Sequence, residues 1–272
     1  GNGSDEILSM ALRACVGSAG RVAYSTPTYS LYTTLAAVAG AKTLEVAWPG
    51  QLEDEGGEGG IPVELQAAAK RADLTFVCSP NSPSGRAVSV DAIAALAQAS
   101  SGLVLADEAY IDFGGQSALE ILGEHDNLLV TRSLSKSFSL AGLRLGLGFA
   151  SPALIESLAK TKDSYNVSAV AAAAGAAALE DYDWMLANAG RIVATRDRVR
   201  AELGERGQRV LESSANFFWL DCGTGGGHRA FERLRSAGVL VRYFDSDALL
   251  DGVRVSVGTD EQMARFVAAL AG

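Results

Sequence analysis

The sequence predicts an α/β fold in which a three-layer α/β/α large domain is followed by a smaller α+β domain. Strand-like and helical stretches alternate through the first part of the chain, which is the pattern of a mostly parallel sheet covered by helices. Two of the strand-like stretches, 74–78 and 103–106, are short and almost wholly apolar, as strands buried on both faces are. After Ser151, helical stretches follow one another before strands return. We therefore place the large domain at residues 1–160 and the small domain at 161–272.

The first helix is expected at residues 4–16. Ser4 is suited to cap it, Asp5 and Glu6 suit the positive end of the helix dipole, and an apolar stripe runs along one face. The acidic, glycine-rich stretch 51–60 predicts a solvated loop. Strands of the large domain are expected at 21–25, 43–48, 74–78, 103–106, 127–131 and 146–150, and helices between them at 31–39, 65–71 and 91–98.

The second part of the chain begins with helices. The alanine-rich stretch 168–179 predicts a helix rather than a linker, and 182–205 predicts one long helix. Further helices are expected at 152–160, 228–236 and 261–270, and strands at 215–221, 239–244 and 253–257.

Composition excludes several classes of protein. The chain has 272 residues, of which 48% are hydrophobic and 20% charged, so it is globular rather than disordered. A net charge of −9 argues against nucleic acid or an anionic membrane as a partner. The apolar runs are too short for a transmembrane helix, and no signal peptide is visible.

Histidine and cysteine contents argue against metal and disulfide chemistry. With only two histidines, the composition argues against a metal cluster and against a histidine-based triad, and we expect no metal site. Three cysteines without zinc or redox spacing predict free thiols in a reducing compartment, and hence a cytoplasmic protein.

Lys136 has surroundings that set it apart from the other four lysines. Hydroxyl residues precede it, an apolar run follows it, and Arg144 lies eight residues further on. A lysine in a partly apolar pocket loses its proton readily and forms a Schiff base with an aldehyde. Hydroxyls and an arginine suit a phosphate. Taken alone, the segment is equally compatible with a surface lysine in a serine-rich loop.

A carboxylate stands at the end of a predicted buried strand. Asp107 follows the strand 103–106, at the position where ligands bind in α/β sheets, and Tyr110 comes three residues later. An acid at this place can pair with a protonated pyridine nitrogen. The alternative is a helix-capping aspartate beside a packed tyrosine.

Three weaker motifs follow strands or open a helix. The turn 79–85 carries two prolines and a glycine around Asn81. The segment 3–6 opens a helix, whose free N–H groups favour an anion. The segment 25–29 places Tyr29 just past a strand. Each motif alone is better explained as a structural turn, but their order and spacing together are specific.

Taken together, these motifs resemble the fold-type I pyridoxal-phosphate enzymes of the aspartate aminotransferase superfamily, and most closely the histidinol-phosphate aminotransferase family. The resemblance covers essentially the whole chain and lacks the family's N-terminal arm. It rests on the segments 3–6, 27–29, 79–85, 107–113, 133–136, 141–144 and 253–259, in which 79–85 has serine for the threonine of the family's N-P-T-G turn.

The resemblance implies a role for each matching residue. Lys136, Asp107 and Tyr110 would be catalytic: the lysine holds the pyridoxal 5′-phosphate, the aspartate pairs with its ring nitrogen, and the tyrosine, together with Asn81, binds its ring oxygen. Substrate would be bound by Asn216, Arg242 and Arg254, the two arginines taking the phosphate and the carboxylate respectively. The residues that it assigns to the cofactor are Ser4, Asp5, Tyr29, Asn81, Asp107, Tyr110, Ser133, Ser135, Lys136 and Arg144.

The activity that this resemblance implies is transamination of L-histidinol phosphate with 2-oxoglutarate, by a homodimer when full length. Alternatives of the same fold are an aromatic amino-acid aminotransferase and a threonine-phosphate decarboxylase. The decarboxylases typically have Pro-Gly-Leu-Arg where this chain has Ala141-Gly142-Leu143-Arg144. From another class, the chain could be the cofactor-sensing effector domain of a transcription regulator. Because the arm closes the substrate pocket in the family, we expect weak transamination from residues 1–272 alone.

Overall fold

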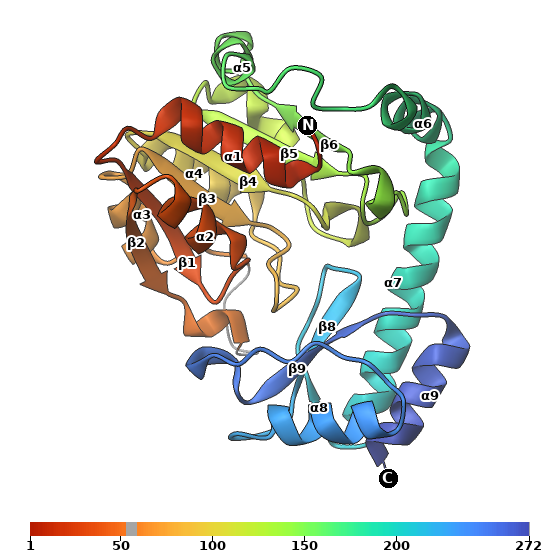
Figure 1. The fold of residues 1–272 in the computed structure, drawn as a ribbon. Helices are drawn as coiled ribbons and strands as arrows, with labels where there is room; N and C mark the ends of the chain where they lie inside the picture. Colours follow the sequence, from red (N-terminus) through yellow and green to blue (C-terminus); the bar gives the residue numbers. More distant parts are fainter. Residues whose placement is uncertain (53–58, 272) are drawn as a thin grey trace.

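The large sheet has six strands in the order β2-β1-β3-β4-β5-β6 (Figure 1). The computed structural model describes residues 1–52 and 59–271. Neighbouring strands from β2 to β5 pair in parallel, and β6 pairs antiparallel with β5. The strands are β1 (Arg21–Thr26), β2 (Lys42–Ala47), β3 (Leu74–Cys78), β4 (Leu103–Asp107), β5 (Leu128–Ser133) and β6 (Gly146–Phe149).

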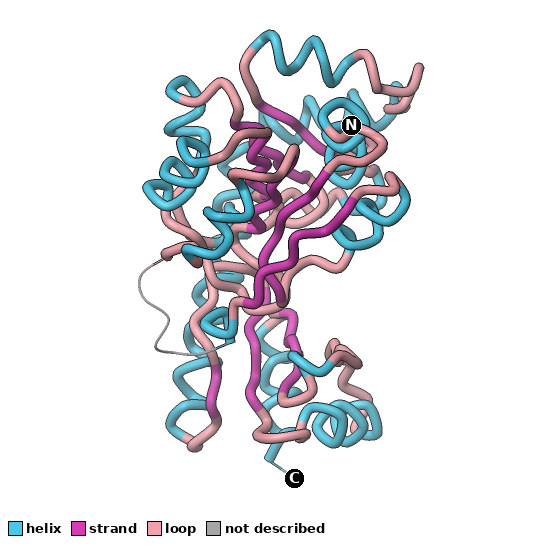
Figure 2. Tube along the Cα trace, turned by 90° about the vertical axis from the view of Figure 1, so that its left-hand side faces the viewer, coloured by secondary structure: helices cyan, strands magenta, loops and turns pink. Residues whose placement is uncertain are grey.

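Helices cover both faces of this sheet, which confirms the predicted α/β class. One face packs against α1 (Ser4–Cys15), α2 (Leu31–Val38) and α5 (Pro152–Ala159). The other face packs against α3 (Val63–Ala69) and α4 (Val90–Ala99). Figure 2 shows the strands between the two helical layers. Strands β3 and β4 are buried along their whole length, as their apolar sequences predict.

A second sheet of three antiparallel strands forms the lower part of the molecule in Figure 1. The long helix α7 (Tyr182–Glu205) extends along one side of the molecule, from the level of the six-stranded sheet to that of the three-stranded sheet. The remaining elements of this part are β7 (Arg209–Val210), β8 (Phe217–Asp221), α8 (Gly227–Ser236), β9 (Gly252–Ser256) and α9 (Asp260–Ala271).

Helix α6 (Ala169–Glu180) packs on the large-sheet side of the molecule. Ala171, together with Met185 and Ala189 of α7, shares an apolar cluster with Leu134 and Phe138. The division at residue 160 therefore stays a prediction, since the chain on both sides of it contributes to one cluster. Short 3-10 helices complete the fold: η1 (Pro49–Leu52), η2 (Ile111–Phe113), η3 (Ala118–Glu124), η4 (Ala141–Leu143) and η5 (Asp247–Leu249).

Three local expectations differ from the structure. Ser4 is the first helical residue of α1, and Gly3 occupies the cap position. The strand predicted at 239–244 is absent from the described structure, where only Arg242 pairs with Arg254. Its first residue is instead held at the end of α8, by an N–H bond to Leu234 of 2.8 Å. Gln51, expected in a solvated loop, is 2% exposed; residues 53–58 of that loop lie outside the described residues.

No helix within residues 1–52 and 59–271 is long and apolar enough to cross a membrane. Over the same residues, no group of three or more His, Cys, Asp or Glu side chains is placed to hold a metal ion.

Candidate active site

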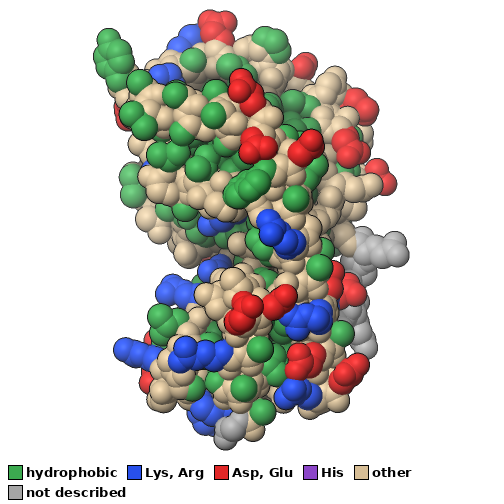
Figure 3. Space-filling view, turned by 90° about the vertical axis from the view of Figure 1, so that its right-hand side faces the viewer, with side chains coloured by type: hydrophobic (Ala, Val, Ile, Leu, Met, Phe, Trp, Pro, Cys, Tyr) green, Lys and Arg blue, Asp and Glu red, His purple; other side chains and the backbone are tan. Residues whose placement is uncertain are grey.

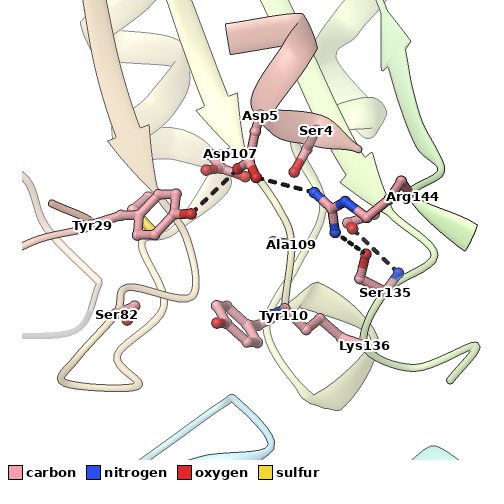
Figure 4. A pocket seen from close by; sticks show the side chains of 12 residues that line it. Ser4, Asp5, Tyr29, Ser82, Asp107, Ala109, Tyr110, Ser135, Lys136 and Arg144 are labelled. Carbon is pink, nitrogen blue, oxygen red and sulfur yellow. Dashed lines mark hydrogen bonds and ion pairs between the residues drawn. The ribbon is translucent and has the colours of Figure 1, made fainter. Parts of the chain in front are cut away.

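A cavity opens at the edge of the large sheet where the parallel strands end. Ligands of α/β sheets bind at this edge. About 510 Å³ of space free of protein atoms lies within the cavity, part of it open to solvent. Figure 4 shows its walls. The lining residues are Ser4, Asp5, Tyr29, Cys78, Ser82, Asp107, Ala109, Tyr110, Ser133, Ser135, Lys136 and Arg144.

One wall is built to receive an anion. The free N–H groups at the start of α1 lie beside the guanidinium of Arg144, which is bonded to Asp5 at 3.1 Å and to the Ser135 hydroxyl at 3.4 Å (Figure 4). Gly3 has a φ of 76°, and a Cβ there would lie 2.4 Å from the Arg144 Nη2 atom. Only glycine therefore allows the guanidinium to approach the helix end this closely.

The floor of the cavity carries a buried carboxylate. Asp107 ends β4, is 3% exposed, and accepts hydrogen bonds from Tyr32 at 2.9 Å and from Thr131 at 3.2 Å. Burial raises the pKa of Asp107, and the two donors oppose that shift. A carboxylate that is buried without a cationic side chain bonded to it is well suited to pair with a cation in the cavity.

Lys136 lies on the loop that follows β5. Its Nζ atom is 5.2 Å from the centre of the Tyr110 ring, and that ring packs edge-on against Phe217 of β8. Burial lowers the pKa of Lys136, and the nearby charge of Arg254 lowers it further. The amine therefore reaches its neutral, nucleophilic form at a lower pH than a solvated lysine.

An ion-pair network ties the loops that carry Tyr110 and Lys136 to each other. Arg132 on β5 contacts Glu108 at 2.9 Å and Asp112 at 2.8 Å. The Ser137 hydroxyl, next to Lys136 in the chain, donates to the other oxygen of Asp112 at 2.5 Å. The loop that carries Tyr110 is thus bonded to β5, and the loop that carries Lys136 is bonded to the Tyr110 loop.

Asn81 is not placed as the resemblance implies. Its amide nitrogen donates to Pro27, to Gln51 and to Ser84, and its amide oxygen accepts from Thr28 at 2.8 Å. With 1% of its surface exposed and its amide occupied by protein groups, Asn81 holds the turn together and does not line the cavity. The next residue, Ser82, lines the cavity instead, a position that the sequence did not single out.

The three residues predicted to bind substrate lie on or beside the strands of the three-stranded sheet. Arg254 on β9 donates to the Ser82 hydroxyl at 2.8 Å, and its guanidinium lies over the rings of Phe217 and Phe244. Arg242 is bonded to Arg254 through backbone groups and also covers Phe244, at 5.0 Å. Two neighbouring arginines on apolar rings would suit a second anion site.

Asn216 has a buried side-chain oxygen without a hydrogen-bond partner among the described residues. Neither Asn216 nor the two arginines are part of the cavity wall itself, but Arg254 reaches it through Ser82. The sequence missed Tyr32, Thr131, Ser82 and Cys78, since no local pattern marks a residue whose partner is distant in the chain.

The residues present fit pyridoxal phosphate. The glycine-lined cradle beside Arg144 suits its phosphate, the unpaired buried carboxylate of Asp107 suits its ring nitrogen, and the amine of Lys136 suits its aldehyde. Tyr29 is an aromatic side wall of the same cavity (Figure 4).

Fold and site together define an aminotransferase of the pyridoxal-phosphate type, and the chain belongs to the family Aminotransferase class I and II, which matches residues 1–270. Its relatives include histidinol-phosphate aminotransferase 1 of Nostoc sp., 41% identical over 99% of this chain and 74% of the relative. Histidinol-phosphate aminotransferase of Geobacter sulfurreducens is 38% identical, again over 99% of this chain and 74% of the relative.

A solved structure shares the fold over the same extent. Histidinol-phosphate aminotransferase from Sinorhizobium meliloti, in complex with pyridoxal-5′-phosphate, superposes with a TM-score of 0.88 at 27% identity. The match covers 99% of this chain and 74% of that one.

Proposed function

We propose that this chain uses pyridoxal 5′-phosphate to transfer the amino group of L-histidinol phosphate to 2-oxoglutarate, yielding imidazole-acetol phosphate and glutamate. The observation that carries this proposal is one cavity that holds an anion cradle, a buried carboxylate and a lysine of lowered pKa. Relatives named for this reaction, at about 40% identity over 99% of the chain, support the choice of substrate.

The residues of the cavity divide the work. When bound, pyridoxal phosphate supplies an aldehyde that takes up the amino group and a cationic ring that withdraws electrons. Asp107 keeps the proton on the ring nitrogen, and Arg144 with the start of α1 binds the phosphate. The amine of Lys136 would hold the aldehyde carbon and, once the substrate amine has displaced it, would move a proton between that carbon and the substrate α-carbon. Tyr110 flanks the lysine and binds the ring oxygen.

The amide of Asn81 is occupied by protein groups and is not free to bind the ring oxygen. We propose Ser82 as the second group at this position, since its hydroxyl lies in the cavity wall and is already bonded to Arg254.

The second anion site, formed by Arg254 and Arg242, binds the amino donor and the amino acceptor. Arg254 binds the carboxylate of glutamate or 2-oxoglutarate, and Arg242 contributes to binding of the phosphate of histidinol phosphate. The buried, unpartnered oxygen of Asn216 is available to accept from a substrate N–H group. These side chains come from the small domain, so the substrate is held between the two domains.

A panel of amino donors tests the proposal. We expect histidinol phosphate to be used with a kcat/KM about 100-fold or more above that of phenylalanine, because only histidinol phosphate carries a phosphate for Arg242. Lys136→Ala is the inactive control. A preference for phenylalanine or tyrosine would indicate an aromatic aminotransferase. Release of carbon dioxide from threonine phosphate would indicate the decarboxylase, and cofactor binding without turnover of any donor would indicate a sensing domain.

We also propose that the protein is a cytoplasmic homodimer. Helix α6 is apolar on all sides, yet only Ala171 and Gly175 of it are buried in this chain, and Val170 is 73% exposed. A helix of this kind is normally covered. A second copy of the chain is the occupant that we propose. The free thiols of the three cysteines suit a reducing compartment.

A further inference from the structure

The Asp107 carboxylate accepts a hydrogen bond from a tyrosine that does not itself line the cavity. The Tyr32 hydroxyl, on α2, donates to the Oδ2 atom of Asp107 at 2.9 Å, and Thr131 donates to the Oδ1 atom at 3.2 Å. Tyr32 is fully buried. The two hydrogen bonds leave the remaining lone pairs of the carboxylate directed at the cavity, because each donor occupies one oxygen from the protein side.

The ring of Tyr32 is fixed by aromatic contacts. It stacks on Phe76 of β3 at 4.4 Å between centroids with planes 2° apart, and its edge meets Tyr29 at 5.7 Å. A phenol held in this way cannot swing away from the carboxylate without disturbing the core. Because burial and the nearby charge of Asp107 raise the pKa of Tyr32, its hydroxyl stays protonated and donates at any working pH.

We propose that Tyr32 is a positioning residue for the reaction: its hydroxyl holds the Asp107 carboxylate as an oriented anion facing the ring nitrogen of the cofactor. This inference rests on the proposed function, in which Asp107 pairs with that nitrogen. A hydrogen bond to a buried charged group is worth more than one between neutral groups. Loss of the hydroxyl should therefore weaken the pairing of Asp107 with a cationic ring nitrogen, and should leave contacts with the rest of the cofactor unchanged.

The experiment compares two ligands and three proteins. The ligands are pyridoxal phosphate and its analogue in which a C–H group replaces the ring nitrogen, so that only the first can pair with Asp107. The proteins are the unchanged chain, Tyr32→Phe and the matched control Tyr24→Phe. Tyr24 is also buried and loses a hydroxyl bonded to Thr33 and Glu45, which lie away from the cavity. Dissociation constants are measured by titration of ligand absorbance.

We expect the unchanged chain to prefer pyridoxal phosphate over the analogue, and Tyr32→Phe to lose about 10-fold of that preference through weaker binding of pyridoxal phosphate alone. Tyr24→Phe should keep the full preference. Equal weakening of both ligands in Tyr32→Phe would show a merely structural role and overturn the inference, as would an unchanged preference. If the unchanged chain shows no preference, the role of Asp107 in the proposed function is wrong, and Tyr32 has nothing to position.

A second variant covers the case in which Tyr32→Phe does not fold. Replacement of Tyr32 by 3-fluorotyrosine keeps the hydroxyl and makes it a stronger donor. The preference for pyridoxal phosphate should then rise above that of the unchanged chain. A preference equal to or below it would contradict the inference.

Discussion

At the scale of single residues, the site depends on charges that are buried at a cost to stability. Asp107 is an acid whose pKa burial raises, and Lys136 is a base whose pKa burial lowers. Both shifts oppose the charged form, so folding alone does not favour either residue at its position. Buried groups with shifted pKa values are typical of functional sites, where the requirements of activity and of stability compete.

Loss of the negative charge at Asp107 should impair turnover more than cofactor binding. Asp107→Asn keeps the size of the side chain and removes the charge that retains a proton on the ring nitrogen. We expect kcat to fall by about 100-fold or more, with the cofactor still bound. Single-turnover rates and a cofactor titration measure the two quantities separately. Near-normal turnover would exclude the proposed role of Asp107.

Removal of the positive charge at Lys136 should stabilise the cofactor-free protein. The pKa of Lys136 is lower in the folded chain than its ordinary value of 10.5, so the folded state binds fewer protons between these two values and its stability rises with pH there. Lys136→Met should therefore raise the free energy of unfolding by about 1 kcal/mol at neutral pH. This gain in the free energy of unfolding of Lys136→Met should become smaller as the pH approaches 10.5.

Urea denaturation at several pH values measures this effect, and Lys70→Met, at an exposed lysine, is the control. A gain that does not depend on pH would mean that the methionine simply packs better than the lysine.

Substitutions of the two substrate arginines should each affect a different half-reaction. Arg254→Lys removes the planar fork that fits a carboxylate and should weaken the glutamate half-reaction most. Arg242→Ala should weaken the histidinol-phosphate half-reaction most, because only that substrate carries a phosphate. Losses of about 10-fold in the affected half are expected for each. Single-turnover measurements of each half test this, and equal losses in both halves for both variants would mark the arginines as structural.

At the scale of elements, the beginning of α1 is shaped around a guanidinium. Gly3 has a φ of 76° and no room for a Cβ beside Arg144. Gly85, in the turn after β3, also has a positive φ, of 84°, and a Cβ there would lie 2.2 Å from the Ser213 hydroxyl oxygen. Glycine at both positions allows backbone and side chain to approach more closely than any other residue permits.

Gly3→Ala should weaken binding of the cofactor through its phosphate. The added methyl group would displace Arg144 and strain the backbone, so affinity for pyridoxal phosphate should fall about 10-fold while affinity for pyridoxal, which lacks the phosphate, changes little. Gly40→Ala is the matched control: φ there is 65°, but nothing lies within 4 Å of the new Cβ. If both variants lose the same affinity, backbone strain alone explains the loss.

At the scale of the whole molecule, the upper part of one face is rich in exposed apolar side chains. Exposed apolar side chains gather on α6 and on the first turns of α7, the helices that face the viewer in Figure 3, where hydrophobic side chains cover much of the upper part. They include Val170, Leu179, Tyr182, Trp184 and Leu186. The proposed second copy would cover this face.

A charge placed on α6 should therefore dissociate the proposed dimer. Val170→Glu would bury a carboxylate in the interface without a partner and should weaken association by about 100-fold. Sedimentation velocity over a range of concentrations measures this. Val38→Glu, at a valine that is 81% exposed on α2, is the control and should leave association unchanged. A chain that sediments as a monomer before any substitution would refute the proposed dimer.

The sequence by itself determined the alternation of elements and most residues of the cavity. Five of these residues could be predicted because each lies at or just beyond the end of a strand that its own apolar pattern predicts. They are Asp107, Tyr110, Ser133, Ser135 and Lys136. The carboxyl ends of parallel strands necessarily meet at one edge of the sheet, so the strand pattern places these residues at that edge, and the family resemblance assigns their roles.

Tertiary structure alone decided which neighbours these residues have. Whether Asn81 or Ser82 faces the cavity depends on contacts with Pro27 and Gln51, which are far away in the chain. Tyr32 reaches Asp107 across 75 positions, and Arg254 reaches Ser82 across 172. Periodicity along the chain reports which face of an element is buried, but hydrogen bonds between distant segments arise only when the layers pack against each other.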